Sequence, residues 1–156
     1  MPGSPPAQVA MINEHLGGHN SAMGLRFIAA HKNELVAELE VAERHLQPYG
    51  LVHGGVLSSM VETLCSVGAA MHVREEGKSA VGLENSTSFL RAVRSGTLRG
   101  TARPVRCGRR SQVWAAEIRD DRDRLVASGH VRLLVLEAGA TADGAEIRLQ
   151  EPDPSD

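Results

Sequence analysis

Residues 54–72 read GGVLSSMVETLCSVGAAMH, and this stretch decides the fold. Its apolar residues recur at three- and four-residue steps, as they do along one face of an α-helix: Leu57, Met60, Val61, Leu64, Gly68 and Met71. The small residues 68–70 would let such a helix lie close to a sheet. The stretch therefore predicts one long helix over residues 54–72 with a single buried face.

Patterns typical of β-strands surround this helix. Residues 24–31 and 34–41 form a predicted hairpin, and a short helix over 7–16 that stops at Gly17-Gly18 precedes it. After the long helix, turn signals separate four predicted strands, and the polar run 84–86 is a candidate interruption of the first of them: 79–90, 97–105, 111–119 and 125–136. One long helix against a largely antiparallel sheet is an α+β layer architecture.

The length and composition of the chain predict one domain, over residues 7–137. Residues 1–6 and 138–156 contain little that can be buried, and we expect both to be disordered tails. A net charge of −2 argues against non-specific nucleic-acid binding, and no run of apolar residues approaches the length of a membrane span. The two cysteines show no framework spacing and the N-terminus lacks signal-peptide regions, so we expect a cytoplasmic protein.

A candidate site begins where the long helix begins, at His53-Gly54-Gly55. The first amide groups of a helix have no intrahelical partners, and glycine leaves them open to a ligand such as a developing oxyanion. Glu62 lies about two turns further on, with serines at three- and four-residue spacing: Ser58, Ser59 and Ser66. A carboxylate in that setting can act as a nucleophile or as a general base.

Each of these features also has an ordinary structural explanation. A single glutamate in an amphipathic helix is usually a solvated surface residue, and a Gly-Gly pair before a helix is usually a turn and a cap. The remaining histidines and the two cysteines show no metal-ligand spacing, so no metal site is expected. Only the combination of these features points to catalysis.

The combination resembles the signature of the hotdog-fold acyl-CoA thioesterases (PaaI-like). The run Gln47–Gly55, followed by Glu62–Ser66, resembles the branch that holds 4-hydroxybenzoyl-CoA thioesterases and 1,4-dihydroxy-2-naphthoyl-CoA hydrolases. Further matches follow in order, in Val81–Asn85, Arg91, Arg94–Gly96 and Gly108–Trp114, so the likeness covers roughly residues 20–136. It implies a hotdog fold, in which a curved antiparallel sheet wraps the long helix.

The resemblance also implies roles for individual residues. Glu62 would be the nucleophile or general base, and the Gly54 amide would polarise the thioester carbonyl. Gln47 and His53 would orient the thioester and the attacking water, and Ser66 would help to position the acyl group or the water. In this family two subunits build each site together, and the dimers of related members pair into tetramers.

A run of arginines is a candidate binding site for the phosphate groups of coenzyme A. No acidic residue lies between Glu84 and Glu117, and arginine suits phosphate through its planar, permanently charged fork. Arg99 and Arg103 alternate with small and apolar residues and are assigned to a solvated strand face. A nucleic-acid patch is disfavoured because interleaved aromatic residues are missing. By resemblance, eight residues would contact the nucleotide or the pantetheine: Gly82, Phe89, Leu90, Arg91, Gly108, Arg109, Arg110 and Ser111.

The sequence thus predicts hydrolysis of an aromatic or otherwise bulky acyl-CoA, without a metal or redox cofactor, by a homodimer or homotetramer. 1,4-Dihydroxy-2-naphthoyl-CoA is a candidate substrate, and a broad-specificity housekeeping thioesterase is an alternative. A non-catalytic acyl-CoA-binding protein on the same fold is a second alternative. A hotdog dehydratase ranks low because the Asp-His loop of hydratases is not seen.

Overall fold

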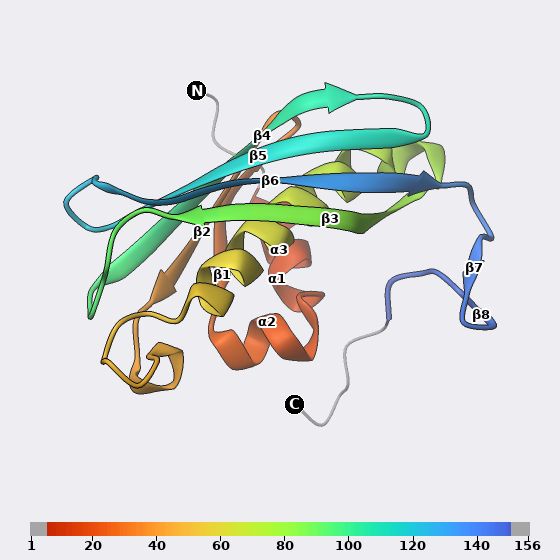
Figure 1. Cartoon of the computed structure of the whole chain (residues 1–156). Helices are drawn as coiled ribbons and strands as arrows, with labels where there is room; N and C mark the ends of the chain where they lie inside the picture. Colours follow the sequence, from red (N-terminus) through yellow and green to blue (C-terminus); the bar gives the residue numbers. More distant parts are fainter. Residues whose placement is uncertain (1–5, 151–156) are drawn as a thin grey trace.

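The computed structural model of the chain describes residues 6–150 (Figure 1). The order of its helices and strands is α1 (Pro6–Glu14), α2 (Gly17–Met23), β1 (Arg26–His31), β2 (Glu34–Glu40), α3 (Gly54–Val73), β3 (Ser79–Phe89), β4 (Thr97–Cys107), β5 (Ser111–Arg119), β6 (Leu125–Leu136), β7 (Thr141–Ala142) and β8 (Ala145–Glu146). Short 3-10 turns span Glu43–His45 and Arg74–Glu76.

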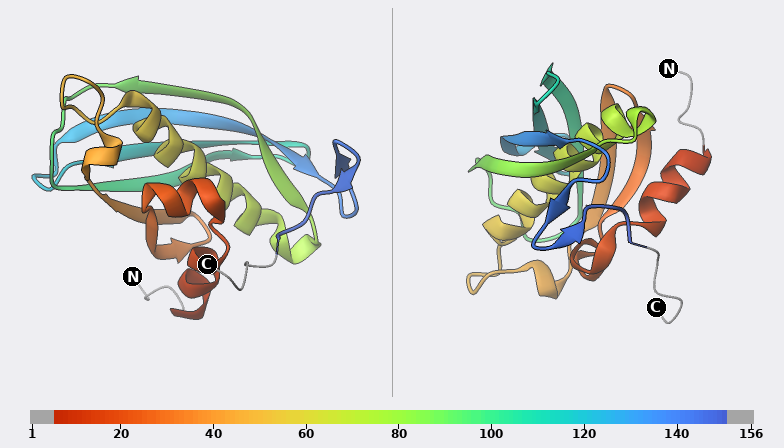
Figure 2. Two further views of the ribbon diagram at one scale, coloured as in Figure 1. Left: turned by 90° about the horizontal axis from the view of Figure 1, so that it is seen from below. Right: turned by 90° about the vertical axis from the view of Figure 1, so that its right-hand side faces the viewer.

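Six antiparallel strands form one curved sheet in the order β1-β2-β4-β5-β6-β3, and α3 packs on one face of it. The sheet curls around α3, while α1 and α2 lie beside this helix (Figure 2). The predicted α+β hotdog architecture is therefore confirmed. The strands β5 and β6 have the bounds that the sequence predicts.

The buried face of α3 is the predicted one, because Leu57, Met60, Val61 and Leu64 are all nearly or fully buried. The helix lies so close to the sheet that a Cβ atom at Gly68 would stand 2.5 Å from the ring of Trp114. Trp114 itself is fully buried. Glycine at position 68 is thus a condition of helix–sheet packing.

Residues 54–76 are long and apolar enough to cross a membrane by length and composition alone, with a mean hydropathy of 1.3. Half of the 18-residue stretch that meets this criterion is buried inside the protein. The central helix of a globular core meets the same criterion, because it is covered by apolar side chains on most sides. We therefore interpret α3 as a core helix.

The strand β3 differs from the other strands in its exposure. Side chains alternate between buried and less buried in β2, β5 and β6, whereas no residue of β3 is fully buried. It forms one edge of the sheet, and its pairing with β6 shifts register between Gly82 and Glu84. The interruption predicted at residues 84–86 is therefore a bulge between Gly82 and Glu84, and the strand itself continues through it.

The N-terminal region contains a helix that the sequence analysis missed. Gly17-Gly18 was expected to end a helix and to lead into a hairpin, but α2 begins at Gly17. The chain restarts there because Gly17 takes a positive φ of 75°, which turns the chain between two helices. Asn20 then joins α2 to α3, since Thr63 Oγ1 donates to Asn20 Oδ1 at 2.7 Å.

Parts of both predicted tails have a defined course. Pro6 begins α1, and residues 138–150 form the β7–β8 hairpin and an extended segment that passes back beneath α3 (Figure 2). The polar composition of residues 138–150 gives no local signal for this course. Residues 1–5 and 151–156 of the predicted tails lie outside the described residues.

Adding a methyl group at position 68 tests the helix–sheet packing. We expect Gly68→Ala to destabilise the protein by ~1–3 kcal/mol, because the new methyl group overpacks the Trp114 ring. Thermal unfolding should report a fall in Tm of about 2–4 °C for each kcal/mol. Gly18→Ala is the matched control, since nothing lies within 4 Å of a Cβ there. Equal stability of the two variants would contradict the close packing.

Candidate active site

Glu62 lies at the centre of a hydrogen-bonded group on the sheet-facing side of α3. Asn85 Nδ2, from β3, donates to Glu62 Oε2 at 2.9 Å and to the Ser58 carbonyl at 3.1 Å. Ser66 Oγ, one turn further along the helix, donates to Glu62 Oε1 at 3.3 Å. The carboxylate is half-buried and both of its oxygens accept a hydrogen bond, so its position is fixed while it stays open to solvent.

A second layer orients Asn85 itself. Thr87 Oγ1 donates to Asn85 Oδ1 at 2.6 Å. That bond makes the amide oxygen the acceptor and leaves the Nδ2 group to donate toward Glu62. Asn85 is thus an unpredicted partner of the candidate base, although the sequence analysis noted it within the Val81–Asn85 match.

The bulge in β3 brings Gly82 and Asn85 to the same face of the strand, where both lie next to Glu62. In a regular strand, residues 82 and 85 would point to opposite faces, because side chains alternate. The register shift between Gly82 and Glu84 adds one residue and turns Asn85 to the helix side. A Cβ at Gly82 would lie only 2.4 Å from Glu62 Oε1, so this glycine makes room for the carboxylate.

A cavity of about 330 Å³ opens beside Glu62. It is lined by His19, Ser58, Ser59, Glu62, Thr63 and Asn85. His19 comes from the unpredicted helix α2, and its Nε2 lies 3.1 Å from Ser59 Oγ. In the sequence this histidine stands isolated, because only the tertiary structure brings α2 beside α3.

The loop before α3 holds Gln47 and His53 in fixed positions. His53 caps the helix, with its Nδ1 accepting from the Gly55 amide at 2.7 Å, so the neutral ring carries its proton on Nε2. The Gln47 side-chain oxygen accepts from the Tyr49 amide. Arg94 Nη1 donates to the carbonyls of Tyr49 and Gly50 at 2.9 and 3.3 Å, which ties the turn to the β3–β4 loop.

His45 anchors the other side of the same loop. It is buried, its Nδ1 accepts from the Ala42 amide at 2.9 Å, and its Nε2 lies 2.7 Å from the Met23 carbonyl oxygen. The His53 amide donates to the His45 carbonyl at 2.8 Å. A histidine that the sequence analysis passed over is therefore part of the support for His53.

The start of α3 lies against the end of β3. A Cβ at Gly54 would stand 2.6 Å from the ring of Phe89, so the aromatic ring covers the glycine backbone. Along the helix axis, Gly54 and Glu62 are eight residues apart, which corresponds to about 12 Å. The predicted carbonyl-polarising amide and the predicted base are therefore well separated within one chain.

The predicted coenzyme A contacts fall into separate groups. The amides of Leu90 and Arg91 donate to the Val126 carbonyl, while the Val135 amide donates to the Arg110 carbonyl. Val126 and Val135 are nine residues apart on β6, so the two groups are ~30 Å apart. The turn 108–111 and the end of β3 lie at opposite ends of the sheet (Figure 1).

The arginine segment is only partly free. As predicted for a solvated strand face, Arg99 pairs with Glu38 at 2.7 Å and Arg103 pairs with Glu34. Arg94 binds the loop carbonyls described above. Among the described residues, the candidate phosphate ligands Arg91, Arg109 and Arg110 make no ion pair.

Cys65 is a poor nucleophile despite its place next to the site. Burial raises the pKa of its thiol to about 12, and the negative charge of Glu62 adds to that rise. The thiol therefore stays protonated near neutral pH. Within residues 6–150, no group of three or more metal-binding side chains is gathered to hold an ion.

Comparisons with known proteins agree on one family. The sequence profile described as "Thioesterase superfamily" matches residues 49–127. One relative is named "Putative esterase Rv1847" and comes from Mycobacterium tuberculosis (strain ATCC 25618 / H37Rv). It is 44% identical over 121 residues, which cover 76% of this chain and 86% of that protein. The 1,4-dihydroxy-2-naphthoyl-CoA hydrolase of Escherichia coli (strain K12) is 35% identical over 114 residues, covering 73% and 83%. The crystal structure of thioesterase HI1161 from Haemophilus influenzae superposes with a TM-score of 0.80 at 31% identity, covering 88% of this chain and 96% of that one.

A methyl group at position 82 should displace the Glu62 carboxylate. We expect Gly82→Ala to break the Asn85–Glu62 hydrogen bond, because the new Cβ takes the place of Glu62 Oε1. A flexible side chain can move aside, so Tm should change by less than about 3 °C. A crystal structure of the variant reads out the displacement, with Ser86→Ala on the same strand as the control. An unmoved carboxylate would disprove the contact.

Proposed function

Because this chain belongs to the thioesterase superfamily, we propose that it hydrolyses an acyl-CoA to a free acid and coenzyme A, with Glu62 as its catalytic carboxylate. The family resemblance inferred from the sequence is confirmed, and the chain is a thioester hydrolase. The observation that carries the proposal is the Glu62 carboxylate, held by Asn85 and Ser66 at the wall of an open cavity.

The proposed chemistry needs one base and one oxyanion donor. As a general base, Glu62 takes a proton from water, and the water oxygen adds to the thioester carbon. The Gly54 amide stabilises the oxyanion at the positive end of the helix dipole. The carbon–sulfur bond then breaks, and the coenzyme A thiolate leaves and takes up the proton. As a nucleophile, Glu62 would instead form an anhydride that water cleaves. Neither route requires a metal or redox cofactor.

We propose that two protomers build each site. The separation of about 12 Å between Gly54 and Glu62 is longer than one thioester carbonyl can bridge. The strand β3 is an unpaired sheet edge, and two copies can join there antiparallel around a two-fold axis. Such pairing reverses the direction of the second copy, which moves its helix start toward Glu62 of the first.

Surface composition and the coenzyme A candidates support the same assembly. Three of the exposed large hydrophobic side chains lie on β3 or directly after it: Leu83, Phe89 and Leu90. A fourth, Tyr49, lies in the loop that Arg94 ties to the β3–β4 loop. Antiparallel pairing would also bring the residue 89–91 group of one protomer to the sheet end that carries the 108–111 turn of the other. The two groups, ~30 Å apart in one chain, would then flank one site. Pairing of dimers into a homotetramer stays a prediction.

The acyl group is proposed from relatives. Proteins named 1,4-dihydroxy-2-naphthoyl-CoA hydrolase, from Listeria monocytogenes and Escherichia coli, are 30% and 35% identical to this chain. That compound, or another bulky acyl-CoA, is therefore the first substrate to assay, and broad specificity is the alternative. We keep the cytoplasm as the proposed compartment, in line with two free cysteines.

Removing the charge of Glu62 tests the mechanism. We expect Glu62→Gln to lower kcat by about a hundredfold or more, because the amide cannot accept the proton from water. Release of coenzyme A thiol from a panel of aromatic and aliphatic acyl-CoAs measures the effect. Glu117→Gln is the matched control, since Glu117 lies on β5, away from this edge strand, and pairs on the surface with Arg119.

The same panel separates the alternatives. Full activity of Glu62→Gln would show that Glu62 is not the catalytic carboxylate. Tight acyl-CoA binding by calorimetry with no thiol release by the wild type would favour the non-catalytic binding protein. Similar kcat/KM values over the whole panel would favour a housekeeping enzyme.

Mixing two inactive variants tests the shared site. Glu62→Gln supplies an intact helix start and His53→Ala supplies an intact carboxylate, so a mixed dimer holds one complete site. We expect co-expression to restore about a quarter of wild-type activity if subunits pair at random. Each variant alone, at the same total concentration, is the control. Activity no greater than the sum of the two single variants would rule out a shared site.

A further inference from the structure

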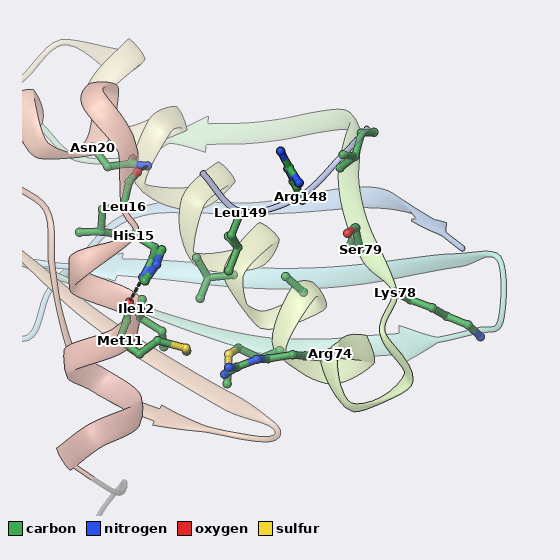
Figure 3. Close-up of a pocket in the computed structure, with 15 residues that line it drawn as sticks. Met11, Ile12, His15, Leu16, Asn20, Arg74, Lys78, Ser79, Arg148 and Leu149 are labelled. Atoms are coloured by element: carbon green, nitrogen blue, oxygen red, sulfur yellow. Dashed lines mark hydrogen bonds between the residues drawn. The ribbon is translucent and has the colours of Figure 1, made fainter. Parts of the chain in front are cut away.

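A cavity of about 280 Å³ lies between α1, the C-terminal half of α3 and residues 147–149 of the C-terminal segment (Figure 3). Figure 3 shows Arg74 extending from the end of α3 toward Met11 of α1, and Leu149 lying at the space between these two helices. Among residues 6–150, no side chain lines both this cavity and the one at Glu62. The two cavities are therefore separate sites.

The inner wall of the cavity is apolar, and its polar groups are already engaged within the protein. His15 Nδ1 lies 2.9 Å from the Met11 carbonyl oxygen. Asn20 Nδ2 donates to the Leu16 carbonyl at 2.7 Å, and its Oδ1 accepts from Thr63. A polar ligand would lose water there without regaining hydrogen bonds, so the wall favours an apolar body. Its main members are Met11, Ile12, Leu16, Met71, Ile147 and Leu149.

The rim of the cavity, in contrast, is positively charged. Arg74 and Arg148 both line the cavity and are both exposed, and within residues 6–150 neither guanidinium makes a hydrogen bond or an ion pair. Lys78 also lines the cavity, but it pairs with Glu76 at 2.7 Å and points away (Figure 3). Of the described residues that line the cavity, none is acidic. A free guanidinium suits an oxyanion, which its planar fork can bind through two hydrogen bonds.

The C-terminal segment is held over the cavity by its own backbone. The β7–β8 hairpin reverses the chain, and the Ile147 amide donates to the Ala140 carbonyl at 2.9 Å. Leu149 follows and lines the cavity, yet its side chain is 67% exposed. A ligand that fills the cavity would remove apolar surface of Leu149 from water, which is favourable. The site is thus preformed, as small-molecule sites usually are.

We propose that this cavity binds an amphipathic organic anion, with its apolar body against the inner wall and its oxyanion head group at the rim that carries Arg74 and Arg148. An apolar cavity of about 150 Å³ holds benzene in another protein. The larger cavity here therefore has room for an apolar body of roughly eight to ten carbon atoms. The proposal does not rest on hydrolysis at Glu62, because the two cavities are separate.

Three probes with the same eight-carbon chain test the head group. Calorimetric titration with octyl sulfate, octanoate and 1-octanol should give a Kd for octyl sulfate about tenfold or more below that for octanol, because only the anion gains charge-assisted hydrogen bonds. Octyl sulfate has no acyl group, so it does not imitate the product of a thioesterase. The octanoate titration shows whether a carboxylate serves as well as a sulfate or phosphate group. Equal affinity for the anions and octanol, or no binding of octyl sulfate, would overturn the proposal.

Variants of the rim and the wall separate the two parts of the site. Arg74→Gln/Arg148→Gln should raise the Kd for octyl sulfate to that for octanol and leave the octanol affinity unchanged. Arg122→Gln is the matched control, since it removes the same charge from an exposed arginine in the β5–β6 turn. Ala70→Leu, which fills the cavity from α3, should weaken all three probes. An unchanged octyl sulfate affinity in the double variant would disprove the role of the rim.

Methionine methyl groups locate the bound probe without any substitution. In protein with ¹³C-labelled methionine methyl groups, octyl sulfate should shift the NMR signals of Met11 and Met71, which line the cavity. Met60, buried beside Gly100, is the internal control and should not shift. Glu62→Gln should bind octyl sulfate as the wild type does. Loss of binding in that variant, or shifts that spare Met11 and Met71, would place the probe elsewhere and overturn the proposal, whatever the outcome of the thiol-release assays.

Discussion

The structure depends on how closely α3 approaches its sheet. Three glycines lie where this helix meets the strands: Gly68 on the helix, and Gly82 and Gly100 on the sheet. Their missing side chains leave room for the Trp114 ring, for the Glu62 carboxylate and for a Leu64 methyl group. A larger residue at position 68 would push helix and sheet apart, because interiors are packed without spare volume, whereas one at position 82 or 100 would displace the end of a flexible side chain. The same closeness that completes the core also brings Glu62 within reach of Asn85.

The candidate site combines a carboxylate that one chain holds in place with partner groups that lie far from it in that chain. Glu62 is held by side chains of its own helix and of β3, so one chain suffices to set its position. The helix start with Gly54 and the arginines at the two ends of the sheet lie too far away to meet at one carbonyl within that chain. An exposed edge strand with apolar side chains on it offers a physical route to joining them. The proposed two-subunit site follows from distances in a single protomer.

Segments outside the profile match at residues 49–127 complete the surroundings of the candidate site. The helices α1 and α2 and the C-terminal segment all lie beside α3, where they line the cavity at Glu62 and the separate cavity further along this helix. His19, Asn20 and Leu149 come from these segments. Since ligand-binding positions commonly lie on connecting segments carried by a rigid scaffold, these are the places where specificity can differ between relatives.

The sequence by itself determined the long helix, six strands of the sheet and the residues that stand at the candidate site. Hydrophobic periodicity and turn residues are local signals, and the Gln47–Gly55 and Glu62–Ser66 runs are contiguous in the chain. Only the tertiary structure decided which residues from outside α3 meet Glu62. Asn85 reaches it through a bulge that reverses strand parity, and His19 through a helix that starts at a glycine expected to end one. The coenzyme A candidates form one cluster in sequence order but lie at two ends of a sheet, because an antiparallel strand carries the chain ~3.3 Å per residue away from where it began.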